Sequence, residues 1–326
     1  MKKIRLLLSI ALIATSAQVF GQGQIVDFLK AGQADANALS QAYLLPYGEM
    51  LGVNLNSGWY NAAKVHKVGG FDITISASYT TAPNSKKKFK PGELETLTPG
   101  TSNGLPDGYA PTMAAGDNAY MTFNDKITNT PVITMEGAGA DVFVNPMIQA
   151  AIGLPFHTEI MGRFMPTVDY GDFGEAGLWG LGLKHSIKDY IPFIKRVPFL
   201  QASVLAAYTD FGAKLSVNEA GIGNGNLETS AGAFTSRLLV GVNIPVVSFY
   251  TGLGYGTTTS NFDLKGDFRV GDDTDTTPDP IALEYNTNGF DFNAGMRIRL
   301  AIISLHADYT VGEYSVITAG VGINFR

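Results

Sequence analysis

The chain has 326 residues, of which 16% are charged and 11% aromatic, and it contains 38 glycines and no cysteine. Its aromatic content excludes intrinsic disorder, and the missing cysteines exclude a disulfide framework, a thiolate metal site, a cysteine nucleophile and a lipid-modified N-terminal cysteine. Beyond the N-terminus no run approaches the roughly 18 apolar residues of a membrane-spanning helix, which argues against a polytopic helical membrane protein.

Residues 1–21 have the features of a secretory signal peptide. Three cations precede a short apolar run, and Val19 and Gly21 fit the positions before a cleavage site at Gln22. Removal of this segment takes away three cations and no acids, so the net charge falls from −6 to −9. An acidic mature chain argues against nucleic acid as a partner, because phosphates need a basic surface.

Residues 22–66 are expected to form an N-terminal helical segment. Apolar side chains recur at helical spacing between Ile25 and Tyr43, and Asp35 is placed to cap a second helix. We therefore predict two short helices and then a stretch rich in Gly and Asn that ends near Lys67. Such a segment either plugs a barrel lumen or rests in the periplasm at its mouth, and the plug is favoured.

From residue 67 onward the dominant signal is alternation. Within residues 290–300 every second side chain is apolar, and those between are polar or small. Successive side chains of a strand point to opposite faces, so one face is apolar and the other polar. This pattern predicts clear strands at 69–80, 156–168, 176–186, 200–210, 233–244, 246–257, 288–300, 302–311 and 314–326, and weaker ones at 118–124, 131–137 and 142–153.

Three features favour an all-β fold of the transmembrane antiparallel barrel type over a soluble sandwich. Many runs last 9–12 residues, close to the roughly 9–11 that a tilted strand needs to cross a bilayer. Aromatic residues gather at the ends of the apolar faces, and short connections alternate with long ones, as in outer-membrane barrels. We predict a barrel over residues 67–326 with about twelve strands, and even counts of ten or fourteen stay open.

The connections give the barrel an orientation. Short turns at Pro245 and at residues 301–302 are assigned to the periplasm. The stretches 81–117, 211–232 and 258–287 are then expected as outer loops. Residues 187–199 break the alternation and are interpreted as a periplasmic connection at the membrane interface.

Several short motifs resemble an exported family common in Bacteroidetes. They are Gly58-Trp59-Tyr60-Asn61 with Gly70-Phe71-Asp72, Ile152-Gly153-Leu154-Pro155 with Arg163-Phe164-Met165-Pro166, Gly182-Leu183-Lys184-His185-Ser186-Ile187, and the end Asn324-Phe325-Arg326. The resemblance covers most of the mature chain and implies an uncharacterised outer-membrane barrel, without catalytic residues to carry over. Helices ahead of such a barrel are also distantly similar to the long-chain fatty-acid transporter superfamily, in architecture alone.

Polar side chains on the inward faces are the candidate site residues. The predicted lumen lining consists of His157, Glu159, Arg163, Arg237, Asp291, Arg297, Arg299, His306 and Asp308. Because both signs of charge occur, two interpretations stay open. The residues either form salt bridges that hold the plug, or they select and contact solutes.

Other candidate chemistry is weaker. Ser304, His306 and Asp308 share a strand face, but same-face neighbours lie roughly 7 Å apart, too far for direct contact between a nucleophile and its base. No catalytic, cofactor or metal site is therefore predicted, and the four histidines lie in separate segments.

Two charged clusters lie in the expected outer loops. The acidic cluster either binds calcium or is simply solvated. The basic cluster either contacts lipopolysaccharide phosphates or is simply solvated. The acidic cluster is Asp272, Asp273, Asp275 and Asp279, and the basic one is Lys86, Lys87, Lys88 and Lys90.

The sequence thus predicts an outer-membrane protein that is porin-like in its role, a passive channel, transporter or binder of small solutes that include hydrophobic ones. Its expected partners are the lipid bilayer and the barrel-assembly machinery. The alternatives are a structural or adhesion barrel that acts through its outer loops and, third, a lipid hydrolase that uses Ser304 and His306.

Overall fold

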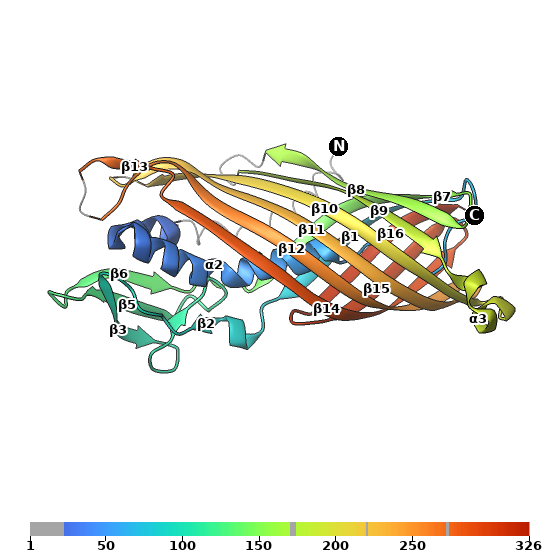
Figure 1. The fold of residues 1–326 in the computed structure, drawn as a ribbon, viewed down its shortest axis with the longest axis horizontal. Helices are drawn as coiled ribbons and strands as arrows, with labels where there is room; N and C mark the ends of the chain where they lie inside the picture. Colours follow the sequence, from blue (N-terminus) through green and yellow to red (C-terminus); the bar gives the residue numbers. More distant parts are fainter. Residues whose placement is uncertain (1–22, 170–173, 220, 272–273, 326) are drawn as a thin grey trace.

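The computed structural model describes residues 23–169, 174–219, 221–271 and 274–325 (Figure 1). Its main body is a closed antiparallel barrel of ten strands, with β13 (Thr276–Pro278) added outside the ring. Ring strands that follow one another in the sequence pair with each other, and the first, β1, pairs with the last, β16, to close the ring. The ring strands are β1 (Phe71–Thr81), β7 (Val142–Leu154), β8 (Thr158–Asp169), β9 (Glu175–Ser186), β10 (Leu200–Glu219), β11 (Gly223–Asn243), β12 (Val247–Arg269), β14 (Ile281–Leu300), β15 (Ile303–Val311) and β16 (Val316–Phe325).

The predicted count of twelve strands is wrong, because two weak candidates belong to another sheet. Candidates 118–124 and 131–137 fall on β5 (Tyr120–Asp125) and β6 (Pro131–Glu136), which pair with each other in a three-stranded sheet. Their alternation arises because this small sheet buries its own apolar face. These strands belong to the insertion between β1 and β7. Its other elements are η2 (Asn84–Lys86), β2 (Lys88–Phe89), β3 (Leu97–Asn103) and β4 (Ala110–Pro111).

The N-terminal segment is more helical than expected. Residues 23–28 and η1 (Leu29–Ala31) are followed by α2 (Gln33–Asn56), one 24-residue helix instead of a short one. The helix runs into the barrel and packs against β14, β12 and β7 (Figure 1). Among the described residues, no helix has both the length and the apolar character needed to cross a membrane.

The predicted capping role of Asp35 is wrong. No side chain caps α2, which begins after Gly32 at a φ of 83°. The buried Asp35 carboxylate instead accepts hydrogen bonds from the backbone N–H groups of Glu95 at 2.6 Å and Thr96 at 2.8 Å. It therefore attaches α2 to the insertion between β1 and β7.

Four neighbouring strands rise above the others at one end of the barrel. The strands β10, β11, β12 and β14 have 20–23 residues, whereas β1, β15 and β16 have 9–11. We call their far parts the outer extension, which comprises residues 211–219, 223–232, 257–269 and 281–289. The predicted loops 211–232 and 258–287 are therefore wrong over most of their length.

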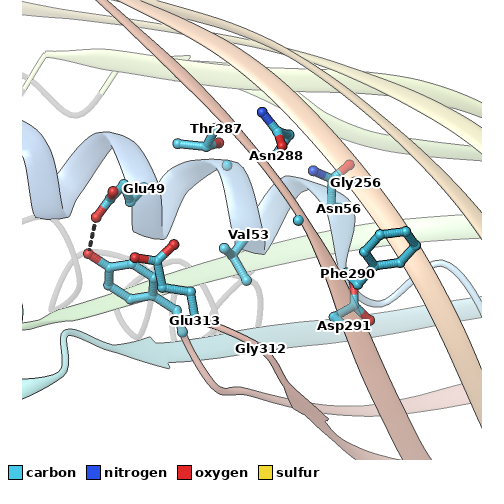
Figure 2. Close-up of a pocket in the computed structure, with 13 residues that line it drawn as sticks. Glu49, Val53, Asn56, Gly256, Thr287, Asn288, Phe290, Asp291, Gly312 and Glu313 are labelled. Atoms are coloured by element: carbon cyan, nitrogen blue, oxygen red, sulfur yellow. Dashed lines mark hydrogen bonds between the residues drawn. The ribbon is translucent and has the colours of Figure 1, made fainter.

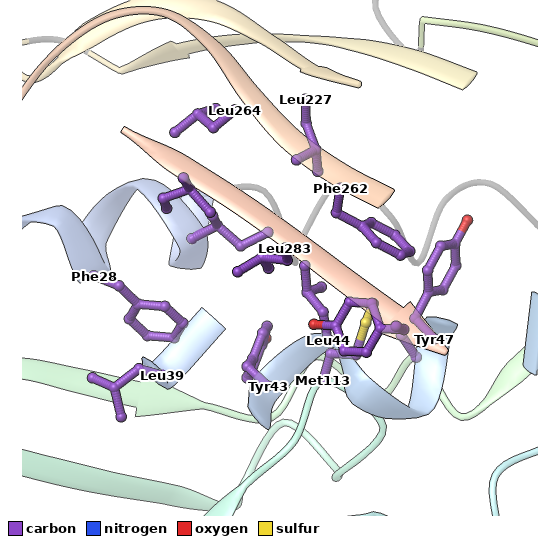
Figure 3. Packing of buried hydrophobic residues seen from close by; sticks show 14 of the residues in the cluster. Phe28, Leu39, Tyr43, Leu44, Tyr47, Met113, Leu227, Phe262, Leu264 and Leu283 are labelled. Carbon is purple, nitrogen blue, oxygen red and sulfur yellow. The ribbon is translucent and has the colours of Figure 1, made fainter. Parts of the chain in front are cut away.

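The reason for this error is that polarity changes sides along each long strand. On β12, Leu253 faces outward and is 55% exposed, and Gly252 and Gly254 face inward. Ten residues further on, Asp263 faces outward, and Phe262 and Leu264 are buried. The pairing with β14 continues through this change without a register shift. The extension thus has an apolar interior against α2 (Figure 3).

Below the change, an apolar belt surrounds the barrel. Outward side chains around the ring are exposed and apolar, for example Leu181 on β9, Leu238 on β11 and Leu305 on β15. Aromatic pairs lie at both ends of the belt: the rings of Tyr255 and Phe290 are 4.9 Å apart, and Phe71 stacks on Phe325 at 5.7 Å. A closed barrel with such a belt and aromatic girdles has the form that spans a bilayer.

The opposite end carries the short connections, and we call it the short-turn end. β7 joins β8 at residues 155–157, β11 joins β12 at 244–246, and β14 joins β15 at 301–302. Residues 187–199 form the connection from β9 to β10, with η4 (Lys188–Tyr190) and α3 (Pro192–Arg196). The C-terminal strand β16 ends at this end too (Figure 1).

Candidate functional site: the charged lumen and the segment that fills it

Residues 57–67, which we call the filling segment, follow α2 through the lower barrel. Arg163 on β8 holds the start of this segment by its main chain. Its guanidinium donates hydrogen bonds to the carbonyl oxygens of Leu55 at 3.0 Å and Ser57 at 2.8 Å. The same guanidinium lies 3.8 Å from the centre of the Trp59 ring. The Arg163 side chain is fully buried, so these contacts replace the water that it loses.

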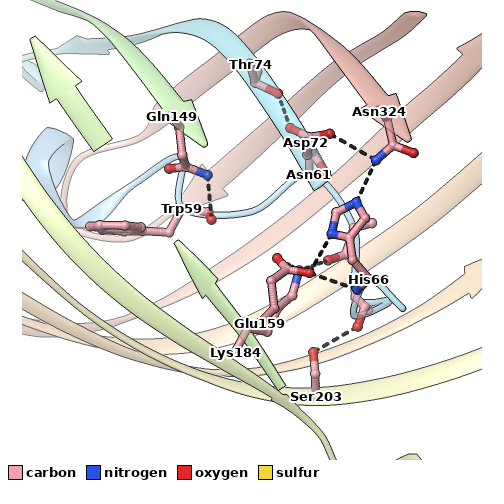
Figure 4. A network of polar contacts seen from close by, with 12 residues as sticks. Trp59, Asn61, His66, Asp72, Thr74, Gln149, Glu159, Lys184, Ser203 and Asn324 are labelled. Atoms are coloured by element: carbon pink, nitrogen blue, oxygen red, sulfur yellow. Dashed lines mark hydrogen bonds and ion pairs between the residues drawn. The ribbon is translucent and has the colours of Figure 1, made fainter. Parts of the chain in front are cut away.

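Uncharged wall side chains hold the segment further along in the same way. The Gln149 amide donates to the Trp59 carbonyl at 3.0 Å, and the Ser203 hydroxyl donates to the Ala63 carbonyl at 2.9 Å (Figure 4). The wall therefore supplies the donors that a segment outside any sheet would otherwise lack. The lower lumen is filled with chain that is bonded to its wall.

A buried ion network closes the lumen near the short-turn end. The Glu159 carboxylate, whose side chain is 1% exposed, lies 2.8 Å from the Lys184 ammonium and 2.6 Å from His66 Nδ1. The His66 backbone N–H also donates to it at 2.9 Å, and His66 Nε2 lies 2.7 Å from the Asn324 amide (Figure 4). One carboxylate thus joins β8, β9 and the filling segment.

A second network lies higher, on the opposite wall. Arg237 on β11 forms a two-point ion pair with Asp291 on β14, at 2.5 and 2.9 Å. The Tyr60 hydroxyl donates to the Asn293 side chain at 3.0 Å, and the Asn293 amide donates to Asp308 at 2.7 Å. Such two-point pairs fix geometry as well as charge.

The structure places eight of the nine predicted lining residues on the barrel's inner side and one elsewhere. Glu159, Arg163, Arg237, Asp291, Arg297, His306 and Asp308 lie in the lumen, and Arg299 lies half-buried at its mouth. The assignment of His157 is wrong. It lies in the turn before β8 with a φ of 53°, and its side chain is 74% exposed and 3.6 Å from Asp189. The strand begins at Thr158, so its alternation does not extend back to His157.

Among the described residues, the Ser304, His306 and Asp308 side chains are not joined to one another by hydrogen bonds. In the part of the chain that the structure describes, the Ser304 hydroxyl and His306 Nδ1 have no hydrogen-bond partner. The Asp308 carboxylate instead accepts from Asn293 and, at 3.1 Å, from Tyr250.

Sequence reasoning missed several residues that hold the segment. Lys184 occupies an inward position of the predicted strand 176–186, and Asp72 and Asn324 lie on the polar faces of theirs, so alternation could have found them. The filling segment has no periodicity, and carbonyl acceptors are common to every residue. Its binding to the wall therefore leaves no trace in the sequence.

A gap in the outer wall opens beside α2. Among the described residues, β15 pairs with β14 only from Phe292 onward, so the earlier part of β14 has no strand on this side. A cavity of about 70 Å³ lies there between α2, β14 and the β15–β16 connection, with Val53 and Phe290 in its lining (Figure 2). Glu49 in the lining pairs with Lys86 at 2.8 Å, which also contacts Glu313, and it accepts the Tyr314 hydroxyl at 2.5 Å.

Several members of the charged loop clusters have partners of their own. Lys86 and Lys87 pair with carboxylates, and Lys88 and Lys90 lie about 5 Å from the Tyr109 ring. Asp279 accepts the Gly266 N–H at 2.9 Å, whereas Asp272 and Asp273 lie outside the described residues. Within the described ranges, no group of three or more candidate metal ligands is found.

A family model described as "Family of unknown function (DUF6588)" matches residues 1–325, and the chain belongs to this family. No curated protein matches the chain. The signal peptide predicted for residues 1–21 lies outside the described residues.

Among solved structures, the chain is similar to several barrels. These include the attachment invasion locus protein Ail of Yersinia pestis (10% identity, 79% of this chain and 98% of that one, TM-score 0.29), the translocator domain of autotransporter NalP from Neisseria meningitidis (10%, 89% and 98%, 0.34) and the transport unit of autotransporter AIDA-I from Escherichia coli (11%, 86% and 99%, 0.35). At such scores the likeness carries no functional argument, and the assignment rests on the chain's own geometry.

Proposed function

We propose that the chain is an outer-membrane barrel that binds small, partly hydrophobic solutes beside α2 and passes them when the filling segment is displaced. The observation that carries this proposal is the cavity at the wall gap. It lies where the outward face changes from apolar to polar, so it adjoins the membrane surface and the outer solvent together. The source in Bacteroidetes that the motifs suggest, and export by residues 1–21, belong to the same proposal.

The location follows from the apolar belt. Exposed aliphatic and aromatic side chains over ten strands would be costly in water, at about 25 cal/mol for each Å² of apolar surface. A bilayer removes that cost, and a closed barrel leaves no unpaired strand edge in lipid. An exported barrel of this kind belongs in the outer membrane.

The cavity is suited to a solute with an apolar body. Phe290, which is 73% exposed, and Val53 supply apolar surface, while Thr287 and Asn288 supply hydrogen-bonding groups. Its three carboxylates already have cationic partners, because Lys86 contacts both Glu49 and Glu313 and Arg237 contacts Asp291. A neutral or weakly polar solute therefore enters without leaving a bare charge.

Passage beyond the cavity needs movement of chain. The filling segment occupies the lower lumen, and its bonds to Arg163, Gln149 and Ser203 are individually worth about 0.5–3 kcal/mol. Such bonds are reversible without local unfolding of the barrel wall. The filling segment is thus the gate in this proposal.

A disulfide between Asn56, the last residue of α2 and directly before the gate, and Gly256 on the wall tests the proposal. A Cβ added at Gly256 would lie 3.3 Å from the Asn56 Cβ, a few tenths of an ångström below the usual range for a disulfide. In an Asn56→Cys/Gly256→Cys variant, we expect oxidation to abolish uptake of small apolar solutes into proteoliposomes, and reduction to restore it.

The cysteine-free parent chain is the control, because reductant leaves it unchanged. Equal uptake by the oxidised and reduced variants would show that movement of the chain at Asn56, where the segment begins, does not gate the barrel. A parent chain that neither takes up solute nor retains a co-purified ligand by mass spectrometry would overturn the whole proposal.

The second candidate function is contact with a partner through the outer parts. Its specific motive is the hairpin β5–β6, which carries Ile127, 93% exposed, at its tip. We expect an Ile127→Asp variant to lose surface attachment of cells that display the protein, with solute uptake unchanged. Loss of uptake with attachment retained would reject this candidate.

A further inference from the structure

The short-turn end of the barrel contains a second hollow, remote from the cavity beside α2. It has a volume of about 870 Å³. Lys64 and Lys67 of the filling segment line it together with Arg299 of β14 and Asn324 of β16. Lys67 is exposed and Lys64 is half-buried, so the hollow is open to solvent.

The positive charges in this hollow are not balanced. Within the described ranges, no carboxylate lies within ion-pair distance of Lys64, Lys67 or Arg299. Of the two buried carboxylates at this end, Glu159 is engaged by its own partners, and Asp72 accepts hydrogen bonds from Asn324, Asn61 and Thr74. Burial, followed by repulsion from the neighbouring cations, lowers the pKa of Lys64. In a chain with an excess of acids, such an unbalanced cluster is a local exception.

The inner end of the hollow contains an unsatisfied donor. Arg297 lines a narrow continuation of about 10 Å³ beside Lys64 and Arg299. Its side chain is only 6% exposed. One guanidinium nitrogen donates to the Asn61 side chain at 2.9 Å, but Arg297 Nε has no partner in the part of the chain that the structure describes. A buried donor without a partner costs about 1–3 kcal/mol, so a ligand oxygen or a bridging water at this point is favoured.

The rim of the hollow is apolar. Val68, Ile302 and Phe325 line its edge and are all substantially exposed. Phe325 belongs to the aromatic pair that ends the apolar belt at this end. The cations therefore lie next to the level at which lipid headgroups meet the barrel.

We propose that this hollow is a binding site for a phosphate group, carried by a phospholipid headgroup or by a soluble phosphate ester. Several cations converge on a space where the described residues supply no acid to neutralise them, and a phosphate supplies both the charge and several acceptor oxygens. Arg297 adds its free Nε donor at the inner end. The apolar rim accommodates the acyl chains or the organic part next to the phosphate.

The test uses the full chain purified in detergent. Glycerol 3-phosphate is titrated as the soluble probe, and native mass spectrometry counts phospholipids retained from vesicles of phosphatidylglycerol or of phosphatidylcholine. We expect a Lys64→Gln/Lys67→Gln/Arg299→Gln variant to bind the same probe with an affinity that is lower by about tenfold or more. The matched control is Lys90→Gln/Lys214→Gln/Lys265→Gln, which removes the same charge from the outer end.

The outcomes separate the two sources. Retention of phosphatidylglycerol without binding of glycerol 3-phosphate identifies a lipid headgroup, and the reverse identifies a soluble ester. The proposal is overturned if the parent chain binds neither probe, or if the control variant loses as much binding as the site variant. Lys67→Glu alone serves if the triple variant does not fold, because Lys67 is exposed, and it must weaken binding too. None of these readouts depends on solute uptake.

Discussion

The lower barrel and the outer extension solve opposite packing problems with the same strands. In the lower barrel the outward side chains of β12 are apolar and the inward ones polar or glycine, whereas in the extension the inward Phe262 and Leu264 are apolar. The reason is what surrounds each part. The lower barrel has lipid outside and the polar filling segment inside, whereas the outer extension has water outside and α2 inside. A continuous strand with unbroken register can therefore be membrane wall in one half and soluble domain in the other.

The largest effect is expected at the ion network of the lower lumen. Glu159→Ala leaves the buried Lys184 without its carboxylate, and breaking such a pair costs about 3–5 kcal/mol. Removing Glu228, the exposed partner of Lys214 in the extension, should cost about 0–1 kcal/mol. Urea unfolding of both variants in vesicles checks this contrast, and equal losses would show that the lumen is hydrated.

Truncation in the core of the extension comes close behind. Phe262 is buried and makes edge contacts with Tyr47 and Tyr285. We expect Phe262→Ala to cost about 3–5 kcal/mol through lost burial and a cavity. Asn261→Ala, one residue away on the outer face, is the control and should change the free energy of unfolding little. A small effect of Phe262→Ala would mean that α2 does not pack against the wall.

Charge scanning on one face of β12 locates the membrane boundary. Leu253→Arg places a cation in lipid and should cost about 2–4 kcal/mol, whereas Thr259→Arg on the same face should cost about 0–1 kcal/mol. The measurement is the free energy of folding into vesicles for each variant. A similar cost at both positions would contradict the change of surroundings between them.

The smallest effect concerns pH and the attachment of the insertion to the extension. Burial alone would lower the pKa of Lys86, but its bonds to the Glu313 and Glu49 carboxylates outweigh burial and raise it above the ordinary 10.5. A raised lysine pKa stabilises below 10.5, and this contribution is lost as pH rises through the folded value. We expect limited proteolysis of the insertion to accelerate above about pH 10.5 in the parent chain and not in Lys86→Met.

The sequence could predict those parts of the fold in which apolar and polar side chains alternate. The nine clear runs and the weaker 142–153 match the ten ring strands, because a strand between lipid and lumen repeats every two residues. The outer extension was predicted as loops because its outward residues, such as Thr259 and Asp263, are polar like those of a loop. Inward Glu159 and Arg163 could be found by parity, whereas His157 failed where the strand gave way to a turn.

The filling segment shows the other limit. Its contacts with Arg163, Gln149 and Ser203 run through backbone carbonyls, which no residue pattern encodes. The length of α2 was also missed, because Gly48 and Gly52 interrupt its apolar spacing. Both features depend on tertiary contacts with a wall that local sequence does not contain.

The grip on main-chain oxygens has an evolutionary consequence. Every amino acid presents the same carbonyl, so Ser57 and Ala63 can mutate freely in side chain, within the limits of space, without loosening the hold of Arg163 and Ser203. At positions held only through their carbonyls, drift should therefore be faster than at the donors Arg163 and Ser203.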